Sequence, residues 1–305
     1  MDENKWMGRI KELEEELRLK ETELSMYRHE LVKANQSLEK IIHQLQGELR
    51  AAQQIQRLLS PTEIPSISGF EFSHKFAPGS TAGGDYFDIF EHDDKMKFGV
   101  LLASSSGYSM SALLLSIVIK ISGSMQARKG LLPHEVVQLI MNEAQPQMQE
   151  KDSSGLFYAV IDRRSFEMSY CFVGPIWAGA LEYESRQFQA FHHHGNKFQK
   201  NSSAPTQSFS IHLNPRDRVI LCTEGLVQAR NPQSEIYGEM NLLQSIINAP
   251  RSGVHELRNE IFYQVEKFSQ SDEPIRDQTA IVMEVKDRVI KLAKKEGFGQ
   301  DKPRL

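Results

Sequence analysis

A single heptad pattern runs through the first sixty residues of the chain. With Ile10 at position a, every later a position up to Leu59 is apolar, and five of the seven d positions are apolar as well. The remaining positions are rich in Glu, Lys, Arg and Gln. Chance rarely keeps an apolar seam in phase over eight heptads, so the pattern predicts one long coiled-coil helix over residues 1–60. At 1.5 Å per residue, about 50 residues make a rod of roughly 75 Å.

Such a helix cannot bury its apolar seam alone, and the simplest partner is a second copy in a parallel homodimer. Lys20 and Glu48 occupy d positions, where each would face its own like charge in an in-register parallel dimer, which counts against that arrangement. The alternatives are a seam that folds back on the chain's own globular part or packs on another protein. The direction of the paired helix stays open. The expected dimer interface is formed by Leu17, Leu24, Leu31, Leu38, Ile41 and Leu45.

The helical pattern ends at Ser60-Pro61, and residues 61–69 have the Pro, Ser and Gly content of a linker. From Phe70 the hydrophobic pattern changes to a period of two, which is typical of strands. Strand groups separated by a helical pair favour an α+β fold class with mostly antiparallel sheets, as one domain over residues 70–286 with a basic tail, 287–305, behind it. Consecutive antiparallel strands are expected over 70–76, 85–91 and 96–103, and later strands over 156–162, 167–173, 178–183, 187–192, 218–223 and 279–285. Helices are expected over 109–128, 133–150, 239–248 and 254–269.

Charge and hydropathy exclude several classes of function. The net charge of −4 disfavours nucleic-acid binding, which relies on clustered Lys and Arg. The longest apolar run, residues 112–119, is far short of the ~20 residues that a bilayer span needs. The N-terminal residues are charged and have no apolar signal core. We therefore expect a cytoplasmic protein with no nucleic-acid partner and no membrane span.

Four short segments follow one another in the predicted domain, and residues 51–61 precede them. Each is weak alone, but together, in this order and spacing, they resemble the PPM-type, metal-dependent serine/threonine phosphatases, specifically the bacterial SpoIIE/RsbU-like branch. The resemblance covers about residues 51 to 286. The segments are AGGDYFD (82–88), LASSSG (102–107), CTEGLVQARN (222–231) and RDQTAIV (276–282).

The resemblance implies a fold and a chemistry. The fold is a sandwich of two antiparallel sheets flanked by helices. The chemistry uses aspartates at one edge of the sandwich to hold two Mn²⁺ or Mg²⁺ ions, which activate a water molecule to attack a phosphoserine or phosphothreonine. One family carboxylate is kept here, one is lengthened by a methylene, and two are gone. The matching positions are Asp85, Ser104, Glu224 and Arg276, and Asp277 follows the last of them.

Arg276 decides between an enzyme and a pseudoenzyme. Its guanidinium places a fixed positive charge where the resemblance implies a dication, and repulsion between these charges at about 4 Å is several kcal/mol even at an effective dielectric near 20. Arg276 can instead replace the metal electrostatically by pairing with Asp85 or Glu224. We therefore predict a pseudophosphatase with no metal cofactor and no catalytic residue, which acts as a dimeric signalling or scaffold protein. By analogy with the family, its partner is a signalling regulator.

Two alternatives remain open. In the first, the chain is an active serine/threonine protein phosphatase of the SpoIIE/RsbU type that acts on a phosphorylated regulatory protein. Asp85, Glu224 and Asp277 would then retain Mn²⁺ or Mg²⁺, and an alignment shifted by one residue at Arg276 would restore a carboxylate. In the second, the long helix makes the chain a structural coiled-coil scaffold of a larger assembly.

Overall fold

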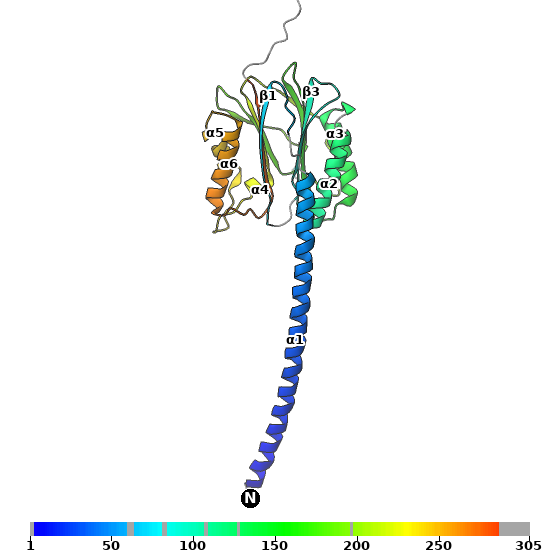
Figure 1. Cartoon of the computed structure of the whole chain (residues 1–305), viewed down its shortest axis with the longest axis vertical. Coiled ribbons are helices and arrows are strands. Elements are labelled where there is room, and N and C mark those ends of the chain that lie inside the picture. Colours follow the sequence, from blue (N-terminus) through cyan, green and yellow to red (C-terminus); the bar gives the residue numbers. More distant parts are fainter. Residues whose placement is uncertain are drawn as a thin grey trace, which may run out of the picture. The chain divides into compact units, whose positions relative to one another are not determined.

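A computed structural model of the chain shows one long helix and one globular domain (Figure 1). They correspond to two compact units, Met1–Ala52 and Gln53–Leu305. The structure describes residues 3–59, 64–80, 84–106, 109–126, 129–195 and 198–286.

Helix α1, Glu3–Leu59, is continuous over 57 residues and confirms the long helix that the heptad pattern predicts. The side chains of the expected dimer interface are each more than half exposed, so helix α1 by itself leaves the seam uncovered. Lys20 at a d position forms an ion pair with Glu23 (Nζ–Oε2 3.1 Å), which offsets part of its charge on the seam. Pairing of this helix into a coiled coil stays a prediction.

The globular unit contains two five-stranded sheets in which every neighbouring pair is antiparallel. This confirms the α+β class and the two-sheet sandwich. The first sheet has the order β1 (Phe70–Ala77), β10 (Gln278–Val285), β9 (Arg218–Thr223), β6 (Ile176–Leu181) and β7 (Phe188–Ala190). The second has the order β2 (Tyr86–Glu91), β3 (Lys97–Ser106), β4 (Ser153–Asp162), β5 (Glu167–Val173) and β8 (Phe209–His212).

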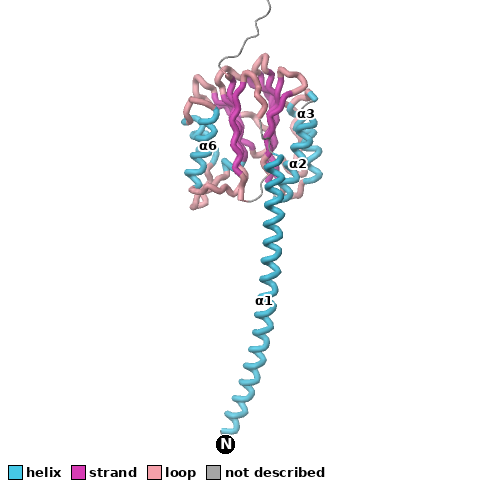
Figure 2. Tube along the Cα trace, in the orientation of Figure 1, coloured by secondary structure: helices cyan, strands magenta, loops and turns pink. Residues whose placement is uncertain are grey.

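Helices cover the outer face of each sheet, so the domain has four layers (Figure 2). Helices α2 (Ser109–Gln126) and α3 (Pro133–Ala144), with the 3₁₀ turn Gln145–Gln147, pack on the sheet of β2–β3–β4–β5–β8. Helices α5 (Gly238–Asn248) and α6 (Val254–Ser269) pack on the other sheet. A single-turn helix, α4 (Glu224–Val227), follows directly after β9.

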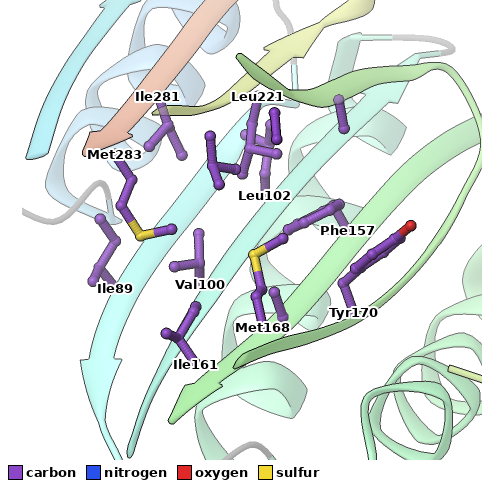
Figure 3. Close-up of a cluster of buried hydrophobic side chains, with 14 of the residues drawn as sticks. Ile89, Val100, Leu102, Phe157, Ile161, Met168, Tyr170, Leu221, Ile281 and Met283 are labelled. Atoms are coloured by element: carbon purple, nitrogen blue, oxygen red, sulfur yellow. The ribbon is translucent and has the colours of Figure 1, made fainter. Parts of the chain in front are cut away.

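Three buried apolar clusters lie between these layers. The central cluster fills the space between the two sheets (Figure 3), and each outer cluster lies between a sheet and its helices. Strand β9 shows why the central strands are apolar throughout: Val219 and Leu221 face the central cluster, while Ile220 and Cys222 face the helices. Successive side chains of a strand point to opposite faces, so a strand covered on both faces needs apolar residues at every position.

The structure corrects the expected neighbour of the first strand. Strand β1 does not pair with β2, as consecutive strands were expected to do, but with β10 at the other end of the domain, from Phe70↔Val285 to Ala77↔Gln278. The hydrophobic period identifies a strand but not its partner, because the pairing is decided by which apolar faces meet in the core.

Several element boundaries also differ from the expected ones. Strand β3 continues three residues past the expected end at residue 103, and β8 and α4 were not predicted. Of the expected linker, residues 61–69, the structure describes 64–69, and Ile67 packs in the central cluster. The expected basic tail, 287–305, lies outside the described residues. Among the described helices, none combines the length and the apolar character that a bilayer crossing requires.

Candidate functional site

A buried carboxylate lies where the two sheets meet at one edge of the sandwich. Asp85 precedes β2 and is only 4% exposed. Its Oδ2 accepts hydrogen bonds from Thr223 Oγ1 (2.7 Å) at the end of β9 and from Thr279 Oγ1 (2.8 Å) in β10. The hydroxyl of Ser104 in β3 is a further hydrogen-bond partner. Asp85 therefore connects the two sheets through side chains of four different segments.

The environment of Asp85 favours its protonated form. Burial, followed by the nearby negative charge of Asp277, raises the pKa of Asp85 to about 7, although the hydrogen bonds from the three hydroxyl groups lower it. Burial destabilises the charged form of a carboxyl group and raises its pKa, unless a cation or enough hydrogen-bond donors compensate for the lost hydration. Near neutral pH this group is therefore poised between its two protonation states.

Asp277 holds the backbone around Asp85 in place. Its Oδ1 accepts a hydrogen bond from the backbone N–H of Gly79 (2.8 Å), and its Oδ2 accepts one from the backbone N–H of Asp85 (3.3 Å). The carbonyl oxygen of Asp277 lies so close to Gly225 that a Cβ atom at that position would be 1.9 Å from it. A glycine is therefore required after Glu224 for α4 and the start of β10 to pack against each other.

Glu224 and Arg276 form an ion pair beside this buried cluster. The distance between Arg276 Nη1 and Glu224 Oε2 is 2.8 Å, and the two side chains are 52% and 25% exposed. Of the two pairings considered for Arg276 in the sequence, the structure has the one with Glu224. A partly exposed pair adds little to stability, but it neutralises the carboxylate that would otherwise be available to a cation.

All five site residues that the sequence analysis named thus lie at one edge of the sandwich. Asp85, Ser104 and Asp277 belong to the buried cluster, whereas Glu224 and Arg276 form the more exposed pair. Sequence reasoning missed the two threonine hydroxyls. Their signal was present, because Thr223 and Thr279 each lie within three residues of a named site residue, at the ends of two apolar strands.

Two cavities flank α4 and the ion pair. One, of about 230 Å³, is lined by residues of α4 and of the segment 271–278, including Arg276 and Arg230. The other, of about 350 Å³, is lined by Glu224, by the turn between β5 and β6, by Trp177 of β6 and by residues that follow β7. Gln228 at the end of α4 lines both cavities. The edge therefore offers two concave places next to α4, one lined by Arg276 and the other by Glu224.

The donor set at this edge does not suit a two-metal centre. Mn²⁺ and Mg²⁺ require several oxygen ligands, of which some must be anionic, at about 2.0–2.2 Å. Within the residues that the structure describes, no group of three or more His, Cys, Asp or Glu side chains is placed to hold a metal ion. Of the two carboxylates that match metal-binding positions of the family, Asp85 accepts hydroxyl hydrogen bonds and Glu224 pairs with a guanidinium.

The comparison with protein families agrees with this fold. The family model of stage II sporulation protein E (SpoIIE) matches residues 94–286, which is more than half of the chain. The chain belongs to the SpoIIE family. Its globular unit is thus a PPM-type phosphatase domain of the SpoIIE/RsbU-like kind, as the motifs predicted. A comparison with curated protein sequences gave no match.

Solved structures similar to this SpoIIE-family chain have the same fold at low sequence identity. The SiaA-PP2C domain of Pseudomonas aeruginosa is 17% identical with a TM-score of 0.65, over 80% of this chain and 97% of that one. The PP2C phosphatase domain and regulatory fragment of SpoIIE from Bacillus subtilis is 13% identical with a TM-score of 0.61, over 71% of this chain but only 63% of that one. The catalytic domain of the phosphatase PstP, in complex with 2 manganese ions, is 11% identical with a TM-score of 0.51, over 72% and 99%. At such identities the likeness shows the fold alone.

Proposed function

We propose that this chain is a pseudophosphatase: a PPM-type domain that has lost its metal chemistry and acts in the cytoplasm as a dimeric signalling or scaffold protein by binding a protein partner. The observation that carries the proposal is the ion pair between Glu224 and Arg276. Both residues stand where the resemblance implies metal-binding aspartates. A guanidinium in that place supplies the positive charge that a metal ion would supply, but it cannot activate a water molecule.

Electrostatics favours the guanidinium over a metal ion at this edge. A dication that approached Glu224 would have to displace Arg276 or lie a few ångströms from its charge, which costs several kcal/mol at an effective dielectric near 20. Ser104 offers a neutral hydroxyl where the resemblance implies a carboxylate shared by both metals. The remaining carboxylate, Asp85, is held by hydroxyl donors and has a pKa raised to about 7, mainly by burial.

Partner binding is supported by the shape of the same edge. The two cavities beside α4 give a partner two concave places on either side of the Glu224–Arg276 pair. SpoIIE of B. subtilis, which has a similar fold, is a cell fate determinant. By analogy with the family, the partner is a signalling regulator, and fold-level analogy does not fix it more closely.

Titration of the whole chain with metal ions tests the proposal. We expect isothermal titration calorimetry with Mn²⁺ and with Mg²⁺ to give dissociation constants weaker than about 1 mM, which corresponds to less than about 4 kcal/mol of binding free energy. In the same buffers, we expect no release of phosphate from a phosphoserine peptide. Metal binding tighter than about 1 mM together with turnover of the peptide would contradict a pseudophosphatase.

The dimer is tested by polar substitution in the seam of α1. We expect light scattering to give the natural chain about twice its 34.8 kDa, and Leu24→Gln with Leu31→Gln to reduce this to one chain, because both residues occupy a positions. The matched control is Leu19→Gln with Val32→Gln, at c and b positions of the same helix, which should leave the dimer intact. A natural chain that is monomeric, or a control that dissociates equally, would contradict the dimer.

One observation favours the alternative of an active phosphatase. The carboxylates of Asp85 and Asp277 lie close enough for the charge of Asp277 to raise the pKa of Asp85, and a bound cation would relieve this repulsion. In that case Asp85 and Glu224, with Asp277, would hold the Mn²⁺ or Mg²⁺. The metal titration above decides between the two functions. A structural coiled-coil scaffold, the remaining alternative, has only the exposed seam of α1 in its favour.

A further inference from the structure

Three turns meet at the edge of the sandwich opposite the candidate site. They are the turn after β6, the turn before β9 and the segment between α5 and α6. Asp217 joins the first two, because its Oδ1 accepts a hydrogen bond from the backbone N–H of Tyr183 (3.0 Å) and its Oδ2 accepts one from that of Asn214 (2.8 Å). Strand β9 runs from this edge to the candidate site, which places the two edges roughly 17 Å apart at about 3.4 Å per residue.

Arginine side chains fasten the third turn to the first two. Arg186 Nη2 donates to the carbonyl oxygen of Ala249 (3.1 Å), and Arg218 Nη2 donates to that of Arg251 (2.9 Å). Arg218 is buried and forms an ion pair with Glu284 (Nε–Oε2 2.5 Å). The backbone at this edge is therefore held by hydrogen bonds from three separate parts of the chain.

Guanidinium groups gather around the ring of Tyr183. The Cζ atom of Arg216 lies 3.8 Å from the ring centroid, and that of Arg251 lies 5.5 Å from it. Arg186 belongs to the same turn as Tyr183, and the carbonyl oxygen that it binds, that of Ala249, is two residues before Arg251. We call Arg186, Arg216 and Arg251 the arginine cluster. Cation–π contact with a fixed ring orients such side chains and limits their rotamers.

The guanidinium groups of the arginine cluster are not ion-paired in the described residues, and the nearby carboxylate of Asp217 accepts hydrogen bonds from backbone N–H groups instead. Within the described part of the chain, none of its three members forms an ion pair, although Glu182 and Glu184 lie on the same turn as Arg186. Burial, followed by the charges of Arg251 and Arg218, lowers the pKa of Arg186. The fold thus holds like charges close together, at a cost that an anion would remove.

The backbone at two of these positions is also unusual. Arg186 and Arg216 have positive φ angles of 59° and 70°, in the left-handed region that favours glycine or asparagine. Such a conformation costs an ordinary residue about 1 kcal/mol or more. At both turns the chain nevertheless carries an arginine. Arg216 lies over the ring of Tyr183, and Arg186 is bonded to the carbonyl oxygen of Ala249.

We propose that the arginine cluster is a binding site for a phosphomonoester group on a protein partner. Guanidinium groups bind phosphate through paired hydrogen bonds, and three of them on separate, anchored turns can surround one dianionic group. The site is independent of the candidate site at the opposite edge, so it stands whether or not the domain hydrolyses phosphate.

A phosphorylated protein fits this cluster better than an anionic membrane. Peripheral membrane binding combines basic residues with apolar or aromatic side chains that insert into the lipid. None of the exposed large apolar side chains in the described residues lies on these three turns. Arg186 and Arg216 are only partly exposed and are fixed by their contacts, which suits a compact group rather than a flat surface.

The test titrates the whole chain with O-phosphoserine, and separately with inorganic phosphate, at low salt by calorimetry. We expect Arg216→Gln with Arg251→Gln to raise the dissociation constant for both at least tenfold. Arg251→Gln alone should raise it at least threefold, and it removes no backbone hydrogen bond, because only the carbonyl of Arg251 is engaged. The matched control is Arg163→Gln with Arg164→Gln on another turn, which removes the same charge and should change the constant less than twofold.

Three results would overturn the proposal. The first is no saturable heat from the natural chain with either probe. The second is an equal loss of affinity in the control variant or in Arg276→Gln, which would mean a general charge effect or binding at the opposite edge. The third is cosedimentation with phosphatidylserine vesicles that depends on Arg216 and Arg251 while O-phosphoserine does not bind, which would assign the cluster to a membrane instead.

Discussion

Substitution of Ser104→Asp, Glu224→Asp and Arg276→Asp together should raise the affinity of the domain for Mn²⁺ at least tenfold. The three changes remove one positive charge and add two carboxylates at the edge where Asp85 and position 224 already provide one each. At an effective dielectric near 20, each unit charge a few ångströms from a dication changes its energy by several kcal/mol. A tenfold change needs only 1.4 kcal/mol, so this expectation leaves room for an imperfect geometry. Calorimetric titration with Mn²⁺ measures it directly.

A matched variant separates the two contributions to this gain. Ser104→Asn, Glu224→Gln and Arg276→Asn remove both charges of the ion pair and add no carboxylate, so this variant should bind Mn²⁺ no better than the natural chain. If it gains as much affinity as the aspartate variant, removal of Arg276 alone explains the effect and a carboxylate site has not been rebuilt. An aspartate variant that folds, as judged by an unchanged urea midpoint of the domain, and still binds no Mn²⁺ would contradict the expectation that the edge lacks only its carboxylate ligands.

The substitution Asp85→Asn should stabilise the domain at pH 8 and remove much of its pH dependence. Burial, followed by the charge of Asp277, raises the pKa of Asp85 to about 7 in the folded protein, against about 3.9 in an unfolded chain. Between these two values the folded state holds a proton that the unfolded state has lost. The contribution of Asp85 to the free energy of unfolding therefore falls as pH rises from about 4 to 7, by roughly 2–4 kcal/mol, and is constant above that.

Urea denaturation at pH 5 and pH 8 measures this difference. Asparagine keeps an oxygen that can accept hydrogen bonds from Thr223 and Thr279, and it has no charge to desolvate. The free energy of unfolding of the Asp85→Asn variant should exceed that of the natural chain at pH 8 and be close to it at pH 5. Parallel pH dependences in the two proteins would contradict this account of Asp85. If millimolar Mn²⁺ stabilises the natural chain at pH 8, the active alternative gains support, because a bound cation would then carry the carboxylate's charge.

The sequence predicts where the helices and strands of this fold lie better than it predicts which strands pair. Strands Glu167–Val173 and Arg218–Thr223 and helix Val254–Ser269 have the expected bounds, because each has a long, unbroken apolar period. Strand β8 was missed because it is short and only partly buried, so its side chains carry little pattern. The pairing of β1 with β10 could not be derived, since it joins residues about two hundred positions apart through a core that no local window contains.

The candidate site shows a similar division. The resemblance located all five named residues at one edge, because motif order reflects strand order in a known fold. It left open whether Arg276 would meet Asp85 or Glu224, and only the packing of α4 against the start of β10 decides for Glu224. The role of Asp277 was also hidden: its carboxylate binds the backbone N–H groups of Gly79 and Asp85, which are far away in sequence. Backbone partners of this kind leave no side-chain motif.

The separation of the three apolar clusters from the site edge has a consequence for substitutions at that edge. Most of the buried apolar surface lies along the middle of the strands and under the helices, whereas the polar cluster around Asp85 closes one rim of the sandwich. A substitution at that rim therefore removes little buried apolar surface, and its effect on stability comes from the polar groups that it changes. The polar rim can therefore change its charges while the three apolar clusters, which supply most of the buried apolar surface, keep their packing.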